Sequence, residues 1–288
     1  MAKNPYDISD VDIAWCPGCG LHSLHSLVKQ SLVELEIPPQ GVVMVSGIGQ
    51  AAKLPHYVQT NWFDGLHGRA LPAALAIKAS NPDLKVIVVS GDGCSYAEGG
   101  NHFMHQILRN PNITHIVSDN QVYGLTKGQA SPTSLKGMIT PVQVSGVTNE
   151  PFNPLGVAIS LGATFVARIY VGDADKSKGI IKQALQHKGY ALVDSFSPCV
   201  SFNKLNTYQW YKEHIYYLDD KHDRHNQTAA FTHAIEADPW PLGIFYQIEG
   251  KPTFEEQLAP YKKSKDPLYK RQVDIQKLQT LIEAKRSI

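Results

Sequence analysis

The four cysteines of this chain are the first candidates for chemistry, because two of them form a C-x-x-C pair. Cys16 and Cys19 stand in the stretch WCPGCG, while Cys94 and Cys199 lie far apart in the sequence. A structural zinc ion or an iron–sulfur cluster would require all four thiolates around one site, whereas a thioredoxin-like couple would need only the pair. The surroundings of Cys94 and Cys199 therefore decide between a metal site and a redox couple.

Oxygen-bearing residues that follow runs of apolar residues form a second group of candidates. Asp92 lies in SGDG after KVIVV, and Asn120 follows the next apolar run in SDNQVYG. Because the carboxyl ends of parallel strands meet at one edge of a sheet, these side chains and the Val122 carbonyl should lie close together. Such oxygens suit Mg²⁺, whose remaining positions are filled by phosphates and water. The pattern indicates a magnesium–diphosphate site, where Gly91 and Gly93 would let a bulky anion approach the backbone. The alternative is that GDG is only a tight turn.

These candidates need a sheet to position them, and the sequence alternates between helical and strand patterns up to residue 202. Apolar spacing predicts a helix after the C-x-x-C pair and further helices at HGRALPAALAIKA, GGNHFMHQILR, NPLGVAISL and DKSKGIIKQALQHKG. Unbroken apolar runs predict buried strands at VVMVS, KVIVVSG, THIVSDN, TFVARIYV and YALVDSF. The alternation predicts an α/β fold with a doubly wound parallel sheet.

The character of the sequence changes after residue 202. The segment NKLNTYQWYKEHIYYLDDKHDRHNQTAAF is aromatic and polar and lacks strand periodicity. We predict a cofactor- and metal-binding domain over residues 1–202, including the C-x-x-C segment, and a C-terminal docking extension over residues 203–288. A loop-rich cap on the same domain is the alternative. The aromatic residues that would form either an interface core or a packed cap are Tyr208, Trp210, Tyr211, Tyr216 and Tyr217.

Composition narrows the class of protein. The 288 residues include 27 Lys and Arg against 26 Asp and Glu, which leaves a formal net charge of +1. This balance gives no electrostatic footprint for nucleic acid or for an anionic membrane. No apolar run is long enough to span a bilayer, and the first residues lack the apolar segment of a signal peptide. We therefore expect a cytoplasmic location, where structural disulfides are rare.

A glycine motif after the first predicted strand offers a different binding hypothesis. Gly47, Gly49 and Ala52 have the G-x-G-x-x-A spacing of a dinucleotide fingerprint. That fingerprint also needs an acid at the end of the second strand to bind a ribose hydroxyl. The nearby acid, Asp64, lies in TNWFDGLHG, which does not read as a buried strand. The pattern therefore does not favour a nicotinamide or flavin site.

Several motifs taken together resemble a known enzyme family. GDG followed across one helix by Asn is similar to the diphosphate-binding motif of thiamine-diphosphate enzymes. This sequence also resembles the β subunit of 2-oxoacid:ferredoxin oxidoreductases. The matching motifs, in chain order, are WCPGCG, LHGRALP, GDGCSYAEGGNHF and DNQVYGLTKGQ. The resemblance covers residues 15–203 and implies the thiamine-diphosphate-binding fold.

The same resemblance implies roles for individual residues. Mg²⁺ would be held by Asp92, Asn120 and the Val122 carbonyl. The residues implied to line thiamine diphosphate are Ile48, Gly49, Gln50, His67, Gly91, Asp92, Gly93, Asn120, Val122, Gly124, Leu125 and Thr126. Among the catalytic candidates, Lys53 would meet the substrate carboxylate or coenzyme A, His67 would lie near the cofactor or substrate, and Leu125 would limit substrate size. The alternatives are a solvated Lys53 and a His67 that caps a helix.

The resemblance also implies a [4Fe–4S] cluster held by the C-x-x-C pair, a cysteine in SPC and a cysteine in GIGC. Cys16, Cys19 and Cys199 match this pattern, but Gln50 stands where the family has its fourth cysteine. Cys94 follows GDG directly, and we predict that it supplies the missing thiolate. The alternatives are zinc in the same cage, or an empty pair with Cys94 as a small packing residue.

The implied activity is the oxidative decarboxylation of a 2-oxo acid to acyl-CoA and CO₂, with electrons passing through the cluster to ferredoxin. In the family, the glutamate that activates the pyrimidine ring lies on a separate α subunit, and nothing in this sequence resembles that half. A non-oxidative thiamine-dependent decarboxylase or synthase half, and a zinc-stabilised binding module, are the alternatives. The sequence does not distinguish among pyruvate, 2-oxoglutarate and branched or aromatic 2-oxo acids.

Overall fold

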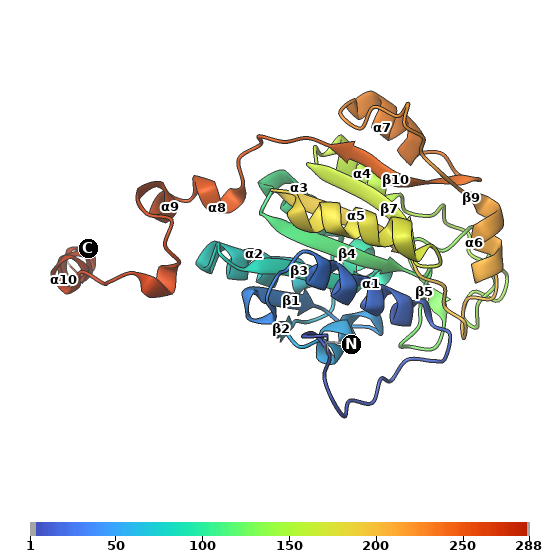
Figure 1. Ribbon diagram of the computed structural model, residues 1–288, viewed down its shortest axis with the longest axis horizontal. Coiled ribbons are helices and arrows are strands. Elements are labelled where there is room, and N and C mark those ends of the chain that lie inside the picture. The colour runs from blue at the N-terminus through green and yellow to red at the C-terminus, as the bar shows by residue number, and fades with distance from the viewer. Residues whose placement is uncertain (1–3, 287–288) are drawn as a thin grey trace.

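An eight-stranded sheet organises the computed structural model, which describes residues 4–286 (Figure 1). The strand order is β2-β1-β3-β4-β8-β7-β10-β9. The strands are β1 (Val42–Ser46), β2 (Asn61–Asp64), β3 (Lys85–Gly91), β4 (Ile113–Asp119), β7 (Phe165–Tyr170), β8 (Tyr190–Phe196), β9 (Ile215–Tyr217) and β10 (Trp240–Gln247). All neighbouring pairs are parallel except β10 and β7, which are antiparallel. The short strands β5 (Val122–Tyr123) and β6 (Gln129–Ala130) form a separate hairpin.

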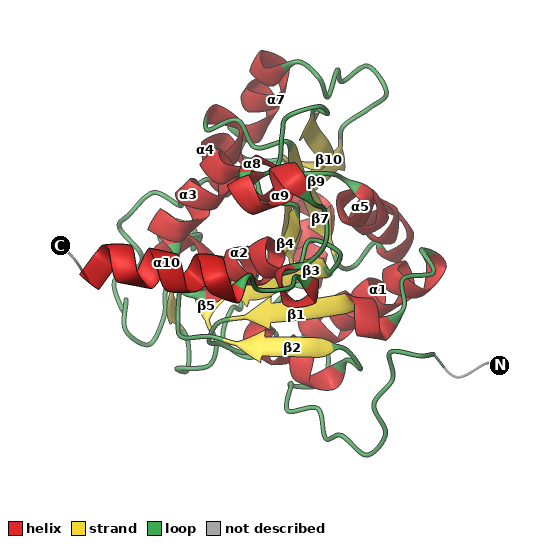
Figure 2. Ribbon diagram, turned by 90° about the vertical axis from the view of Figure 1, so that its left-hand side faces the viewer, coloured by secondary structure: helices red, strands yellow, loops and turns green. Residues whose placement is uncertain are grey.

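Helices cover both faces of the sheet (Figure 2). One face carries α1 (Gly20–Glu34) and α5 (Ala174–Gln186), and the other carries α2 (Ala70–Ser80), α3 (Gly100–Arg109), α4 (Pro154–Ser160) and α7 (Gln227–Ala234). Strand β3 shows why its sequence is an unbroken apolar run. Ile87 and Val89 pack in the core on the α1 side, while Val86 and Val88 pack in the core on the α2 side. The predicted doubly wound α/β fold is confirmed.

The order of the strands creates a switch point between β1 and β3. From β1 the chain passes to β2 on one side, whereas β3 lies on the other side of β1 and leads on to β4. In open α/β sheets, ligands bind beyond the carboxyl ends of strands at such a point. The residues after β1, β3 and β4 therefore meet at one edge of the sheet.

The glycine motif after β1 does not open an α-helix. The residues that follow it form a 3₁₀ helix, Ala51–Tyr57. Asp64 ends the exposed edge strand β2, where its carboxylate accepts from the Ser46 hydroxyl and pairs with His56. A dinucleotide site would need an α-helix N-terminus and an unpaired acid. The glycine motif has neither, so it does not form such a site.

The sheet continues past the boundary predicted after residue 202. Strands β10 and β9 follow this point, and β10 joins the sheet through β7. Helix α6 (Tyr208–His214) packs its aromatic residues on this end of the sheet, with Tyr211 fully buried against Tyr170 and Phe196. Tyr208, Trp210 and Tyr217 are partly buried in the same cluster. These aromatic residues therefore pack as a cap on the sheet.

A C-terminal arm that includes three α-helices and the 3₁₀ helix Leu268–Lys270 extends from the sheet. Figure 1 shows its course. The α-helices of the arm are α8 (Phe254–Gln257), α9 (Ala259–Lys263) and α10 (Ile275–Arg286). The Tyr261 hydroxyl donates to the Ala79 carbonyl at 2.7 Å, which holds the start of the arm against α2. Helix α10 buries no residue. Of the residues described, no helix has the length and apolar character needed to cross a membrane.

Candidate functional site

A pocket lies at the carboxyl ends of β1, β3 and β4, and we call it the strand-tip pocket. Every residue that the resemblance implies for the cofactor lines it: Ile48, Gly49, Gln50, His67, Gly91, Asp92, Gly93, Asn120, Val122, Gly124, Leu125 and Thr126. Ala51, Cys94 and Tyr123 complete its wall, and sequence analysis did not place them there. Lys53 does not line the pocket. The three loops converge because their strands are adjacent in the sheet.

The buried carboxylate of Asp92 lies at the end of β3. Asp92 is 2% exposed, and burial raises its pKa to about 6. Hydrogen bonds from Ser131 and Thr133 act in the opposite direction and lower this pKa. The neighbouring Gly93 is needed for a close approach, because a Cβ there would lie 2.1 Å from the Tyr123 ring. An anionic oxygen buried beside a pocket is stable when a cation binds it. This environment fits a metal ligand better than a turn residue.

A tight turn after β4 presents the other oxygen donors. Gln121 has a φ of 58°, and the Val122 amide donates to Asn120 Oδ1 at 3.1 Å. The backbone carbonyl of Asn120 accepts a hydrogen bond from the Asn203 side-chain amide at 3.1 Å, and this bond helps to hold the turn in place. Val122 is then held by β5 pairing. Asp92, Asn120 and Val122 thus line one pocket. A carboxylate, an amide oxygen and a backbone carbonyl are the kinds of donor that suit Mg²⁺ together with a diphosphate.

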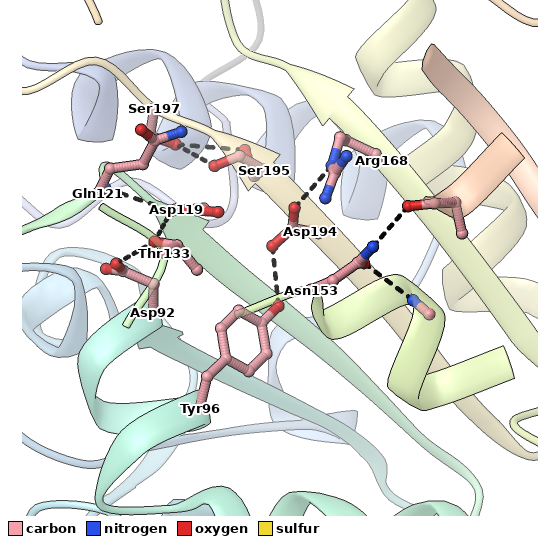
Figure 3. A network of polar contacts seen from close by, with 12 residues as sticks. Asp92, Tyr96, Asp119, Gln121, Thr133, Asn153, Arg168, Asp194, Ser195 and Ser197 are labelled. Carbon is pink, nitrogen blue, oxygen red and sulfur yellow. Dashed lines mark hydrogen bonds and ion pairs between the residues drawn. The ribbon is translucent and has the colours of Figure 1, made fainter. Parts of the chain in front are cut away.

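Thr133 links Asp92 to a second buried acid (Figure 3). Its hydroxyl lies 2.7 Å from Asp92 Oδ2 and 2.7 Å from Asp119 Oδ1. A hydroxyl carries one proton, so it can donate fully to only one of them. Burial, with Asp194 and Asp92 nearby, raises the pKa of Asp119 well above its usual range. A protonated Asp119 can donate to Thr133, which leaves the Thr133 proton for Asp92.

A buried ion pair between Arg168 and Asp194 lies near Asp119. Asp194 accepts from Arg168 Nε at 2.9 Å and from the Tyr96 hydroxyl at 2.8 Å, as Figure 3 shows. Arg168 is 8% exposed at its side chain, and Asp194 is fully buried. Sequence analysis missed Thr133, Asp119 and Asp194. Only Asp119 and Asp194 carried a sequence signal, because Asp119 ends a buried strand and Asp194 lies within one.

His67 lies at the rim of the strand-tip pocket and does not cap a helix. Helix α2 begins at Ala70 with no side-chain cap, so the helix-capping alternative is wrong. His67 Nε2 lies 3.6 Å from Glu98, which also accepts from the Tyr123 hydroxyl at 3.0 Å. His67 Nδ1 is buried without a partner. The 3.6 Å from Nε2 to Glu98 is too long for a hydrogen bond, and Nδ1 has no hydrogen-bond partner among the described residues.

A second pocket shares a wall with the first, and we call it the cysteine pocket. It is lined by Cys16, Cys19 and Cys199, and Gln50, Asn120 and Gly124 belong to both pockets. Gly20 lets the C-x-x-C turn approach the SPC loop, because a Cβ there would lie 2.8 Å from the backbone of Ser197. The Gly20 amide donates to the Pro198 carbonyl at 3.1 Å. Segments remote in the sequence are thereby joined.

The three thiols are close enough to affect one another. Burial first, and then the neighbouring Cys199 and Cys16, raise the pKa of Cys19, and the Leu21 amide acts against this. The Ser201 hydroxyl donates to Cys16 Sγ at 3.1 Å, and the Phe202 amide donates to Cys199 Sγ at 3.4 Å. Hydrogen bonds to sulfur stabilise thiolates that ligate iron. The pocket thus fits three ligands of a cluster.

Cys94 does not line the cysteine pocket, where the prediction placed it as a fourth ligand. Its sulfur accepts from the Gly68 amide at 3.2 Å and packs against Gly47, and the residue lines the strand-tip pocket. The physical reason is the π-helical turn Gly93–Ala97, which turns the side chain after GDG toward the loops that follow β1 and β2. Gln50 lies beside the three cysteines instead.

Within residues 4–286, no three or more His, Cys, Asp or Glu side chains are grouped closely enough to hold a single metal ion. A structural zinc requires four such ligands around one ion, which counts against a zinc cage. A cubane differs, because each cysteine binds its own iron and the sulfur atoms can stand farther apart. A magnesium ion also needs few protein ligands when phosphates supply the rest.

Two family models match consecutive parts of the chain. The family model described as thiamine pyrophosphate enzyme, C-terminal TPP binding domain, matches residues 43–195. The model for the C-terminal part of the pyruvate ferredoxin oxidoreductase beta subunit matches residues 199–263. Together the two models match most of residues 43–263.

Individual relatives cover most of the chain. The 2-oxoacid:ferredoxin oxidoreductase subunit beta of a Sulfolobus species is 42% identical over 88% of this chain and 87% of its own length. The subunit of the same name from Saccharolobus solfataricus is 41% identical over 85% of each chain. A solved structure of 2-oxoglutarate:ferredoxin oxidoreductase from Magnetococcus marinus, with 2-oxoglutarate, coenzyme A and succinyl-CoA bound, is 34% identical with a TM-score of 0.89 over 97% of this chain and 96% of that one. The chain therefore belongs to the family of 2-oxoacid:ferredoxin oxidoreductase beta subunits.

Proposed function

We infer that this chain is the subunit that binds thiamine diphosphate and Mg²⁺ in an enzyme that oxidises a 2-oxo acid to acyl-CoA and CO₂ and passes the electrons to ferredoxin. The observation that carries this proposal is the shared wall of Gln50, Asn120 and Gly124 between a diphosphate-type pocket and a pocket of three cysteines. A decarboxylase without electron transfer has no use for thiols beside its cofactor. The free thiol state of all four cysteines suits a cytoplasmic location, which belongs to the same proposal.

The strand-tip pocket would hold the cofactor by its diphosphate. Asp92, Asn120 and the Val122 carbonyl would bind Mg²⁺, and the Asp92 carboxylate is kept in place by Thr133. Gly124 has open space around its Cα, where a Cβ would meet nothing, so the backbone is accessible to a bound group. Bound thiamine diphosphate would supply the electron sink needed to release CO₂ from a 2-oxo acid.

The residues at the rim would act on the substrate. His67 has one free ring nitrogen, so it can donate to or accept from a substrate oxygen. Leu125, 40% exposed, would limit the size of the substrate side chain. Lys53 lies outside the pocket, so a contact with the substrate carboxylate or coenzyme A would have to be made beyond its wall.

The cysteine pocket would hold an iron–sulfur cluster through Cys16, Cys19 and Cys199. Its common wall with the strand-tip pocket gives electrons a short route away from the cofactor. The Ser201 hydroxyl and the Phe202 amide would stabilise the reduced, more negative cluster by donating to two of the sulfurs. Ferredoxin would accept the electrons from this side of the chain.

A second chain would complete the active site. No glutamate lines the strand-tip pocket in the described part of the chain, yet thiamine activation in this family requires one. Apolar side chains are exposed near the pocket, with Ile48 at 42% and Leu66 at 76%. The C-terminal arm also exposes apolar residues of α10, namely Ile275, Leu278, Leu281 and Ile282. Such surfaces are typical of a contact with a second polypeptide, and the docking role predicted for residues 203–288 is now proposed for this arm.

The test is a reaction with the chain alone and with its α subunit. The purified complex should reduce ferredoxin or a viologen dye when given a 2-oxo acid and coenzyme A, and the isolated chain should show no turnover. Decarboxylation by the complex without any dye reduction would instead favour the non-oxidative decarboxylase. Turnover by the isolated chain would contradict the two-chain site.

A further inference from the structure

Gln50 has an unusual environment for a glutamine. Its side-chain oxygen Oε1 is buried and has no hydrogen-bond partner, while its backbone carbonyl accepts from the Trp15 indole at 2.9 Å. Leaving a buried acceptor unpaired costs about 1–3 kcal/mol. Among the described side chains that line the cysteine pocket, Gln50 alone carries a buried polar atom without a partner. An unpaired oxygen on a residue that lines the same pocket as three cysteines can be satisfied by a donor or by a metal ion.

Among the described residues, no fourth thiolate reaches this pocket. Cys16, Cys19 and Cys199 come together, but Cys94 is 4% exposed and its sulfur is already engaged by the Gly68 amide in the strand-tip pocket. Moving it would require the turn Gly93–Ala97, which positions Asp92, to rearrange. The fourth corner of a cubane would therefore face Gln50 and not a cysteine.

We propose that the cysteine pocket holds a four-iron cluster anchored by only three thiolates, so that one iron, next to Gln50, is exchangeable. This inference rests on the proposed function, because it assumes that the pocket holds a cluster at all. Carboxamide oxygen is a hard, neutral donor and binds iron of a cluster more weakly than thiolate does. Replacing a thiolate by a neutral ligand also makes the cluster one charge less negative, which raises its reduction potential.

Release of that iron can be written as a balanced step. A [4Fe–4S]²⁺ cluster gives one electron to ferricyanide, releases one Fe²⁺, and leaves a [3Fe–4S]⁺ cluster with all of its sulfide. Ferricyanide becomes ferrocyanide. Dithionite and added Fe²⁺ reverse the step by supplying the electron and the iron. A cubane with four cysteine ligands loses iron less readily under this treatment, because a thiolate holds each iron.

The experiment uses the complex with its α subunit, prepared anaerobically and treated with one equivalent of ferricyanide per cluster. Iron and sulfide are then measured after desalting, and the paramagnetic cluster is identified by EPR. Wild-type protein should fall from about four irons to about three, keep its sulfide, and show a [3Fe–4S]⁺ spectrum that dithionite with Fe²⁺ abolishes. Gln50→Cys should keep about four irons under the same treatment.

Two further variants complete the design. Gln59→Cys places a thiol at an exposed position in the same segment, outside both pockets, and should behave as wild type. Cys94→Ser should leave the iron content unchanged, while Cys16→Ser should lower it. The proposal is overturned if wild type keeps its iron as Gln50→Cys does, or if Cys94→Ser loses iron as Cys16→Ser does. Absence of iron from both wild type and Gln50→Cys would overturn the cluster itself, and with it the proposed electron route.

Discussion

The strand-tip pocket and the cysteine pocket share Gln50, Asn120 and Gly124, yet they are assembled in different ways. The oxygen donors of the first stand at the ends of β3 and β4, whose register pairs Gly91 with Ser118. The sulfur donors of the second stand on two loops that are joined by the hydrogen bonds of Gly20 with Pro198 and of Ser201 with Cys16. All three of the predicted oxygen donors line the strand-tip pocket, whereas three of the four predicted thiols line the cysteine pocket.

The largest effect that would separate the two pockets is expected from Asp92→Ala. Replacing residues that only support a metal ligand typically costs 10–100-fold in affinity, so loss of a ligand should weaken Mg²⁺-dependent binding of thiamine diphosphate by at least about 100-fold. Iron content should not change, because Asp92 does not line the cysteine pocket. Calorimetric titration and an iron assay measure the two effects.

The control for this variant is Asp83→Ala, at an exposed carboxylate away from both pockets. It should bind the cofactor as wild type does. Equal affinity in wild type and Asp92→Ala would show that GDG is a turn and not a metal-binding motif.

A smaller effect is expected from Thr133→Val. The change removes the hydroxyl between Asp92 and Asp119 and leaves two buried acids without that partner. We expect cofactor affinity to fall about tenfold, at the low end for a residue that positions a metal ligand. Thr133→Ser keeps the hydroxyl and should restore most of the affinity, and the Mg²⁺ dependence of binding measures both. If the two variants bind equally well, the hydroxyl does not position Asp92.

The smallest effect is expected from Leu125→Ala, which concerns the substrate. The side chain lines the strand-tip pocket but is 40% exposed, so we expect its removal to shift kcat/KM toward bulkier 2-oxo acids by only a few-fold, below the ~10-fold of a closed pocket. Leu108→Ala, at an exposed position on α3, is the matched control. An unchanged ranking across a panel of 2-oxo acids would exclude Leu125 as a size-limiting residue.

Much of the sheet could be predicted because its central strands are buried on both faces. Runs such as KVIVVSG have apolar residues toward both helical layers, and this leaves a signal in the sequence. Strand β10 was missed because WPLGIFYQ contains Pro241 and Gly243, which are unfavourable in strands. Its place depends on antiparallel pairing with β7, a contact between distant parts of the chain.

The residues of the candidate site, like the strands, could be predicted only in part. Asp92 and Asn120 follow strands, so their meeting could be inferred from the order of the elements. Thr133 comes from a long irregular segment after β6, where no periodicity indicates which side chain will reach the buried acids.

The sequence by itself determined the doubly wound sheet, the family resemblance and most residues of the strand-tip pocket, because strand patterns and motif spacing are local properties. Only the tertiary structure decided which residues line the cysteine pocket. The direction of the Cys94 side chain depends on the turn after β3 and on the Gly68 amide that its sulfur accepts from. Spacing along the chain carries no information on that direction, and so Gln50, not Cys94, stands beside Cys16, Cys19 and Cys199.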